Sequence, residues 1–244
     1  MKILSIDTAS NVCGVSILDD KKSLCFLDTN TGRTHSENLM PMVQEAFEKT
    51  NLKLSDMDLL VCDLGPGSFT GIRIGVATVK AFVDSLNIPC SGISSLKALA
   101  YNLIDDSCES DVVCSNIDCK NDNCYFALYE KSNGIFETLI EPQAESIDSA
   151  LAIISSYYED SLSSPKITFV GDGSVTFKNK IQEQLSNIKK MNFASDDKNS
   201  LSSYSLGLAG LDDYNLGLCD KEILPLYLKK PQAQRQLEEK LKKM

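Results

Sequence analysis

The sequence predicts an α/β protein built from two related lobes, each a mixed sheet flanked by helices. Two patterns recur in the same order. An apolar strand that ends in Asp leads through a polar turn to a returning strand, first over 2–18 and again over 111–129. An apolar strand then runs into a glycine-rich turn and a helix, first over 58–86 and again over 167–186. Repetition of a whole unit indicates a duplicated fold, and we place the boundary near residues 104–111.

The strands of the first lobe are expected at 2–7, 12–18, 24–29 and 58–64. Residues 2–7 are mostly Ile and Leu with little alternation, which is typical of a strand buried on both faces. The first three strands follow one another closely, so we expect an antiparallel meander. The first turn of that meander lies directly after Asp7.

Three helices are expected in the first lobe, at 36–50, 72–86 and 94–104. Residues 36–50 carry apolar side chains at helical spacing. Ser36 is the expected N-cap, and Pro41 lies early enough in the helix to bend it. The third helix is expected to pack across the boundary between the lobes.

The second lobe is expected to repeat this plan. Its expected elements are strands at 111–118, 124–129, 135–140 and 167–170 and helices at 146–158 and 175–186. No low-complexity linker separates the halves, so the lobes should pack closely. The domain boundaries that follow are an N-terminal lobe over 1–106, a C-terminal lobe over 107–228, and a basic tail over 229–244 that is expected to be helical.

The chain has 244 residues, with 24 Lys and Arg against 34 Asp and Glu, which gives a net charge of −10. This acidic balance opposes unaided binding to nucleic acid. The tail at 229–244 differs, because it holds six basic and two acidic residues. The tail is either a solvated terminal helix or a segment that touches RNA or an acidic partner.

Features of composition also indicate the compartment. No apolar run reaches the about 18 residues of a membrane span, and the first strand meets Asp7 too early for the core of a signal peptide. The nine Cys form an odd set, which fits free thiols in a reducing cytoplasm better than a disulfide framework. We therefore expect a cytoplasmic protein that has no membrane partner.

Metal and nucleophilic chemistry have few candidate residues. His35 is the single histidine, so this chain alone cannot build a two-histidine metal site, and a Ser-His-Asp or Cys-His triad would have to use it. The alternative for His35 is a positioning or capping role. Cys108, Cys114, Cys119 and Cys124 cluster without CxxC spacing. They are either structural thiols or a metal site, and the absence of CxxC spacing argues against the metal site.

The most distinctive string is Gly-Pro-Gly-Ser-Phe-Thr-Gly at 65–71, where a strand meets a helix. Glycines allow close backbone approach and a helix N-terminus attracts anions, so phosphate binding is one interpretation. The string matches neither a Walker A loop nor Gly-x-Gly-x-x-Gly. The other interpretation is a tight turn that lets the next helix pack on the sheet. A vestigial nucleotide or phosphate site would comprise Asp7, Ser10, Gly65, Gly67, Ser68, Gly71, Asp118, Gly171 and Gly173.

Residues 64–75, Leu-Gly-Pro-Gly-Ser-Phe-Thr-Gly-Ile-Arg-Ile-Gly, closely resemble the signature of the TsaB (YeaZ) family. Further agreement lies in residues 3–9, 35–41, Asp118 with Tyr125, and 225–233. The resemblance therefore spans nearly the whole chain. It implies the two-lobed ASKHA fold shared by actin, the Hsp70 ATPase and sugar kinases, which agrees with the duplicated plan.

The resemblance also implies a function. Members of the family are non-catalytic paralogues of TsaD, which transfers a threonylcarbamoyl group to the tRNA adenosine beside the anticodon, and in bacteria both work with the ATPase TsaE. The implied role is a scaffold or activator of TsaD, without an intrinsic cofactor, that meets tRNA only through the complex. ATP or ADP would bind weakly or through that complex. Leu39 follows His35 by four residues, where TsaD carries the second histidine of its metal site. Cys119 and Lys120 replace the Ala-Arg that usually follows the Asp at 118.

The helices at 36–50 and 71–86 form the TsaD-facing surface that the resemblance implies. The candidates are His35, Ser36, Leu39, Met40, Met42, Val43, Phe47, Ile74, Thr78 and Phe82. Met and Phe suit an interface, although each of these residues could instead face its own sheet. An exposed apolar face would also drive homodimerisation when TsaD is absent. The alternative functions are an ATP-dependent kinase or hydrolase with Asp7 or Asp118 as base, and a tRNA-binding module that uses the basic tail.

Overall fold

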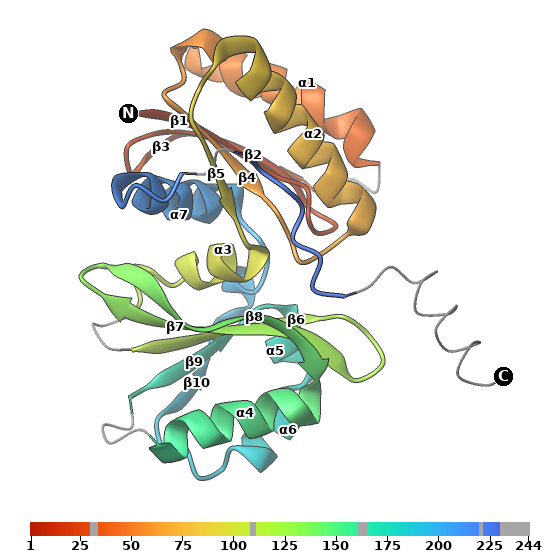
Figure 1. Ribbon diagram of the computed structural model, residues 1–244, viewed down its shortest axis with the longest axis vertical. Helices are drawn as coiled ribbons and strands as arrows, with labels where there is room; N and C mark the ends of the chain where they lie inside the picture. The colour runs from red at the N-terminus through yellow and green to blue at the C-terminus, as the bar shows by residue number, and fades with distance from the viewer. Residues whose placement is uncertain (30–33, 108–110, 161–164, 220–221, 230–244) are drawn as a thin grey trace, which may run out of the picture.

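Two sheets of the same topology form the two lobes of the computed structural model, which describes residues 1–29, 34–107, 111–160, 165–219 and 222–229 (Figure 1). The first sheet has the strand order β3 (Lys22–Thr29), β2 (Cys13–Asp19), β1 (Lys2–Asp7), β4 (Leu59–Asp63) and β5 (Cys90–Ile93). The second sheet has the matching order β8 (Ile135–Ser146), β7 (Asn123–Ser132), β6 (Val112–Asp118), β9 (Ile167–Val170) and β10 (Met191–Phe193). The predicted duplicated α/β fold is confirmed.

The pairing of the strands repeats as well. In the first sheet β1 runs antiparallel to β2 and parallel to β4, and in the second β6 runs antiparallel to β7 and parallel to β9. Strand β8 continues to Ser146, beyond the predicted end at 140. The edge strands β5 and β10 were not predicted. They are short, and the sequences Cys-Ser-Gly-Ile and Met-Asn-Phe lack the continuous apolar run that marks the four-residue strand β9.

Helices cover the outer face of each sheet, as Figure 1 shows. Helices α1 (His35–Thr50) and α2 (Phe69–Leu86) pack on the first sheet, and α4 (Ile147–Asp160) and α5 (Asp172–Thr176) pack on the second. The helix predicted over 175–186 is in fact α5 followed by α6 (Lys178–Gln184), with Phe177 between them. No helix in the part of the chain that the structure describes is long and apolar enough to cross a membrane.

The inner faces of the sheets are covered by two helices that the halves exchange. Helix α3 (Ser95–Tyr101) belongs to the first half but packs on β6, β7 and β8, whereas α7 (Ser203–Asn215) comes from the second half and packs on all five strands of the first sheet. The two helices also contact each other between the sheets (Figure 1). The expected packing of the third helix across the boundary is confirmed. Residues 203–215, counted with the C-terminal lobe in the predicted boundaries, return to the N-terminal sheet.

Polar contacts join α3 to α7 in the middle of the molecule. The Lys97 ammonium forms an ion pair with Asp213, and both side chains are largely buried. The Tyr101 hydroxyl donates a hydrogen bond of 3.0 Å to Asp212 Oδ2. Burial and the neighbouring Asp212 carboxylate both raise the pKa of Tyr101, so its hydroxyl keeps its proton.

The starts of α1 and α2 differ from the prediction. The residue that caps α1 is Thr34 instead of Ser36, and the Thr34 backbone N–H donates to the Glu37 carboxylate at 3.1 Å. Helix α2 begins at Phe69, three residues early, because the Ser68 hydroxyl caps it by accepting from the backbone N–H of Gly71 at 3.2 Å. Most of the predicted basic tail, residues 230–244, lies outside the described residues.

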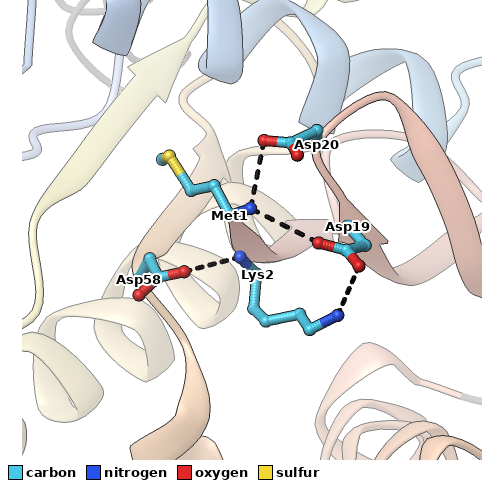
Figure 2. Close-up of polar contacts among 5 residues, drawn as sticks. All are labelled: Met1, Lys2, Asp19, Asp20 and Asp58. Carbon is cyan, nitrogen blue, oxygen red and sulfur yellow. Dashed lines mark hydrogen bonds and ion pairs between the residues drawn. The ribbon is translucent and has the colours of Figure 1, made fainter.

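A group of carboxylates fixes the start of β1 (Figure 2). The amino group of Met1 lies 3.0 Å from Asp20 Oδ1 and 3.3 Å from Asp19 Oδ1. The Lys2 backbone N–H donates to Asp58 Oδ2 at 2.7 Å, and Lys2 Nζ lies 2.6 Å from Asp19 Oδ2. Hydrogen bonding to Asp20 is the main reason that the pKa of the Met1 amino group is raised. These contacts tie β1 to the β2–β3 turn and to the segment before β4.

Candidate functional site

A cleft of about 630 Å³ lies between the lobes, at the ends of β1 and β6. Four residues of the predicted nucleotide set line it, namely Ser10, Gly67, Ser68 and Asp118. The remaining five, Asp7, Gly65, Gly71, Gly171 and Gly173, are buried beside the cleft and do not line it. Lys120, Tyr125 and Asp172 also line the cleft. The cleft thus offers hydroxyl groups and charges of both signs to a polar ligand.

The carboxylate of Asp118 is already occupied by its own turn. Its Oδ1 accepts from the Lys120 backbone N–H at 2.8 Å, and its Oδ2 lies 3.0 Å from Lys120 Nζ. The Asp118 backbone N–H in turn donates to Asp172 Oδ1 at 3.0 Å. Burial raises the pKa of Asp172 from its ordinary value. Asp118 therefore organises the β6–β7 turn and the start of α5.

The glycine string packs α2 against the turn that follows β1. A Cβ atom at Gly67 would lie 2.1 Å from the Ala9 carbonyl oxygen, and one at Gly71 would lie 2.0 Å from the Thr8 carbonyl oxygen. The Ser68 backbone N–H donates to Ala9 O at 2.6 Å, and the Thr8 hydroxyl donates to Gly71 O at 2.8 Å. The backbones approach too closely to leave room for a side chain at either glycine, which supports the packing interpretation.

The second lobe repeats this close approach. A Cβ atom at Gly171 would lie 2.2 Å from the main-chain oxygen of Asn116, and one at Gly173 would lie 2.1 Å from Asn116 Oδ1. Gly171 also has a φ of +104°, a conformation that glycine tolerates and other residues rarely adopt. Both glycine-rich turns therefore let a helix start close to the backbone of a central strand, in β6 itself or in the turn directly after β1.

Asp7 shares its buried site with a carboxylate that the sequence analysis missed, Asp63 at the end of β4. Both side chains are 1% exposed. Asp63 Oδ1 accepts from the Gly65 backbone N–H at 2.7 Å and from the Ser95 hydroxyl at 2.6 Å, while Asp7 Oδ1 accepts from the Ala9 backbone N–H at 2.8 Å. Burial raises the pKa of both carboxyl groups, and the charge of Asp63 raises that of Asp7 further.

This pair is structural in character. Asp63 Oδ2 is buried without a hydrogen-bond partner among the described residues, and a proton held on Asp7 can donate to it. A catalytic base must be ionised and must reach its substrate. Asp7 is buried and does not line the cleft, so it does not meet the second condition. Its signal in the sequence was the Asp that ends an apolar strand, and Asp63 carries the same signal.

His35 holds the start of α1 against the turn after β1. Its Nε2 lies 2.7 Å from the Ser10 main-chain oxygen, so Nε2 carries the proton and donates it. Its Nδ1 is buried without a partner among the described residues. No group of three or more His, Cys, Asp or Glu side chains within the described ranges could hold a metal ion. The contact favours the positioning role.

Two members of the cysteine cluster belong to the core of the second lobe. Cys114 and Cys124 are buried in adjacent strands, and burial raises the pKa of each thiol. Cys119 lies at the cleft, within 2.6 Å of Lys229 Nζ. Cys108 lies outside the described residues. The three described members are therefore spread between a core and a surface.

A separate apolar groove of about 460 Å³ runs between α1 and α2. It is lined by Met40, Pro41, Val43, Gln44, Phe47, Leu54 and Phe82. Among the predicted partner residues, Ser36 and Met40 are exposed and His35, Phe47, Ile74, Thr78 and Phe82 are half-buried. Leu39, Met42 and Val43 are at least nine-tenths buried against their own lobe. These three residues lie on the α1 stripe that covers the sheet, and Val43 also lines the groove. Their contact with TsaD stays a prediction.

The two duplicated lobes, the exchanged helices and the cleft between them give this chain the two-lobed ASKHA fold. The fold is similar to that of a ROK hexokinase from Thermus thermophilus, with a TM-score of 0.54 and 10% identity over 88% of this chain and 100% of that one. It is more similar to YeaZ from Pseudomonas aeruginosa, with a TM-score of 0.73 and 21% identity over 93% of this chain and 99% of that one.

Sequence comparison adds the family. The family described as "TsaD: tRNA N6-adenosine threonylcarbamoyltransferase" matches residues 28–237, so the chain belongs to this family, and within it to the TsaB (YeaZ) branch. Proteins named "tRNA threonylcarbamoyladenosine biosynthesis protein TsaB" are 34% identical over 144 residues in Bacillus subtilis and 30% identical over 149 residues in Escherichia coli. Each match covers 59% of this chain, and it spans 61% and 64% of the two relatives.

Proposed function

We propose that this chain is a non-catalytic scaffold and activator of TsaD in the transfer of a threonylcarbamoyl group to the tRNA adenosine 3′-adjacent to the anticodon. The names of the curated relatives place them in threonylcarbamoyladenosine biosynthesis. The supporting observation in the fold is an apolar groove that is separate from the cleft.

That observation is the groove between α1 and α2. Met40 is 50% exposed at its rim, and Phe47 and Phe82 are half-buried along its walls. Exposed apolar side chains that converge on one groove favour burial against a protein partner. The proposed partner is TsaD, a paralogue of the same fold, and a second copy of this chain would cover the groove when TsaD is absent.

Reconstitution tests the proposal. TsaD and its nucleotide, threonine-derived and tRNA substrates are assayed with and without this chain, and complex formation is followed by co-elution. We expect co-elution and a large rise in modified tRNA when the chain is present. Transfer that proceeds equally well without the chain would contradict the proposed role.

The chain is proposed to have no catalysis of its own. Asp7 is buried, Asp118 is engaged by Lys120, and His35 donates to a main-chain oxygen. None of these three residues is poised as a base or a metal ligand. Incubation of this chain alone with the threonylcarbamoyl adenylate and tRNA should give no modified tRNA, and robust transfer would overturn this part of the proposal.

The cleft favours weak nucleotide binding as a second candidate activity. Ser10, Ser68 and Lys120 line it, and the sequence of the glycine string matches no Walker A loop. We expect ATP or ADP to bind weakly here or through the assembled complex. Calorimetry with Mg-ATP distinguishes weak nucleotide binding from an ATP-dependent enzyme. Micromolar affinity with turnover would favour an ATP-dependent kinase or hydrolase.

The remaining proposed interactions follow from the same role. The ATPase TsaE would join the complex of TsaD with this chain in the cytoplasm. Because the chain carries a net charge of −10, tRNA is proposed to bind only through the complex. Deletion of residues 231–244 should leave the salt dependence of tRNA binding by the complex unchanged, and a marked change would favour the tRNA-binding role of the tail.

A further inference from the structure

Residues 222–229 run beside α2 from the first lobe toward the second (Figure 1). We call residues 222–229 the strap. Near its start, Ile223 is 2% exposed in the core of the first lobe, and the Leu226 backbone N–H donates to the Leu64 main-chain oxygen at 2.7 Å. A buried side chain and a backbone hydrogen bond fix this end firmly.

Side chains of α2 hold the strap along its length. The Tyr227 ring lies 5.2 Å from that of Phe69, and the Tyr227 hydroxyl accepts from Arg73 Nε at 2.7 Å. The Arg73 guanidinium also lies over the Phe69 ring, 3.7 Å from its centre. Lys80 Nζ lies 3.0 Å from the Glu222 carboxylate.

The contacts along α2 share one side of the helix. Phe69, Arg73 and Lys80 are four and eleven residues apart, which places them on one stripe. The half-buried residues proposed for TsaD binding, Ile74 and Phe82 among them, lie on a different stripe. The strap therefore occupies a side of α2 that the proposed partner leaves free.

The far end of the strap reaches the second lobe. Lys229 Nζ lies 2.6 Å from Cys119 Sγ and 5.6 Å from the centre of the Tyr125 ring, and both of these residues line the cleft. The Tyr125 ring is half-buried, and a single contact between a cation and such a ring is weak. Among the described residues, side-chain contacts from Lys229 to Cys119 and Tyr125 hold this end, whereas a buried side chain and a backbone hydrogen bond hold the other. We therefore expect this end to open more easily.

We propose that the strap is a releasable fastener between the lobes, fixed to the first lobe at Ile223 and Leu226 and detachable from the second at Lys229. When fastened, it sets a positive charge at the rim of the cleft and holds the β6–β7 turn toward α2. When released, it frees that turn and widens the opening of the cleft.

Hydrogen exchange on the full chain, followed by mass spectrometry of peptides, tests the fastener. Tyr227→Ala should speed exchange of the strap amides about tenfold, because it removes the aromatic pair and the hydroxyl acceptor. Lys229→Met should speed exchange about threefold, in the 119–125 turn and at the far end of the strap. Tyr214→Ala, an exposed tyrosine on α7 outside the strap, is the matched control and should change neither region.

A milder pair of variants guards against a loss of folding. Tyr227→Phe keeps the ring, and Arg73→Ala removes the guanidinium, so a double-mutant cycle measures their coupling in strap opening. Coupling above about threefold supports the fastener. Two results would overturn it. One is strap amides that exchange in the unmodified chain as fast as in an unstructured peptide, and the other is an exchange rate in the 119–125 turn that Lys229→Met leaves unchanged. The experiment needs no TsaD, so its result is independent of the proposed function.

Discussion

His35 Nε2 donates a hydrogen bond to the main-chain oxygen of Ser10 over a distance of 2.7 Å. The contact joins the first residue of α1 to the turn after β1, which is also the turn that the glycine string packs against. The single imidazole of the chain thus links two backbone segments.

We expect His35→Ala to lower the free energy of unfolding by about 1 kcal/mol, the usual net value of such a bond. In a chain of this size that loss corresponds to a fall of about 2–4 °C in Tm. His35→Gln should recover part of it, because the Gln amide can donate to the same oxygen. Thermal denaturation followed by circular dichroism measures both variants, and equal Tm values for His35→Ala and the parent chain would refute the role.

The buried carboxyl pair predicts a stability that falls with rising pH. The folded pKa of Asp7 is raised above its unfolded value, so the folded state keeps a proton that the unfolded state releases. The stabilisation is complete below the unfolded pKa of about 4 and is lost as pH rises through the folded pKa.

Asp7→Asn keeps the Oδ1 acceptor and removes this titration. Relative to the parent chain, we expect the variant to gain roughly 1 kcal/mol or more between pH 5 and pH 8. Urea denaturation at several pH values measures the difference. Asp84→Asn, at an exposed carboxylate, is the control and should leave the profile unchanged. Parallel profiles for Asp7→Asn and the parent chain would show that Asp7 is ionised when folded.

Gly71→Ala tests the packing interpretation of the glycine string. Alanine is favoured over glycine inside a helix by about 1 kcal/mol, so propensity alone predicts stabilisation. The new Cβ would lie 2.0 Å from the Thr8 main-chain oxygen, and we expect a net loss of about 2–3 kcal/mol instead. Gly134→Ala has no atom within 4 Å of its Cβ and should lose only about 1 kcal/mol for its φ of +77°. Chemical denaturation compares the two, and a stabilised Gly71→Ala would exclude the packing role.

The apolar groove predicts which substitutions separate partner binding from folding. Phe82→Glu and Met40→Glu should each weaken TsaD binding by more than tenfold and leave the fold intact. Met42→Glu should instead destabilise the chain, because Met42 is 8% exposed. Ala77→Glu, on an exposed side of α2, is the control. Titration calorimetry with TsaD and circular dichroism provide the two readouts, and unchanged affinity for Phe82→Glu would remove this groove from the interface.

The ion pair between α3 and α7 should contribute more to the stability of the fold than surface ion pairs do. Lys97→Met leaves the carboxylate of Asp213 largely buried and unpaired, at a cost of about 3 kcal/mol. Adding Asp213→Asn should restore most of that loss. Lys49→Met breaks an exposed pair with Glu45 and should change the stability little, because solvent screens that pair. Similar losses for Lys97→Met and Lys49→Met would contradict the structural role of the pair.

The sequence predicted the helices and strands whose pattern of apolar residues reports directly on how they are buried. Residues 2–7 are uniformly apolar because β1 is central in its sheet, and the duplicated strand–turn order survives in both halves. Helix α7 left no such trace. It lies between the sheet and α3, so it is buried on nearly every side and lacks the polar face that marks a helix in a sequence.

The site was partly predictable for similar reasons. The strand-ending Asp identified Asp7 and Asp118, and applied evenly it would also have found Asp63. Spacing could not decide which apolar side of α1 covers the sheet, because Met40 and Met42 are chemically alike and differ only in direction. That choice is made by tertiary packing, which buries Met42 and leaves Met40 at the groove.

The exchange of α3 and α7 means that neither half carries the inner wall of its own sheet. A chain cut near residues 107–111 would yield two pieces, each with one apolar sheet face open to water. Each piece on its own should aggregate. Co-expression should let the two pieces assemble, because each supplies the helix that covers the other's sheet.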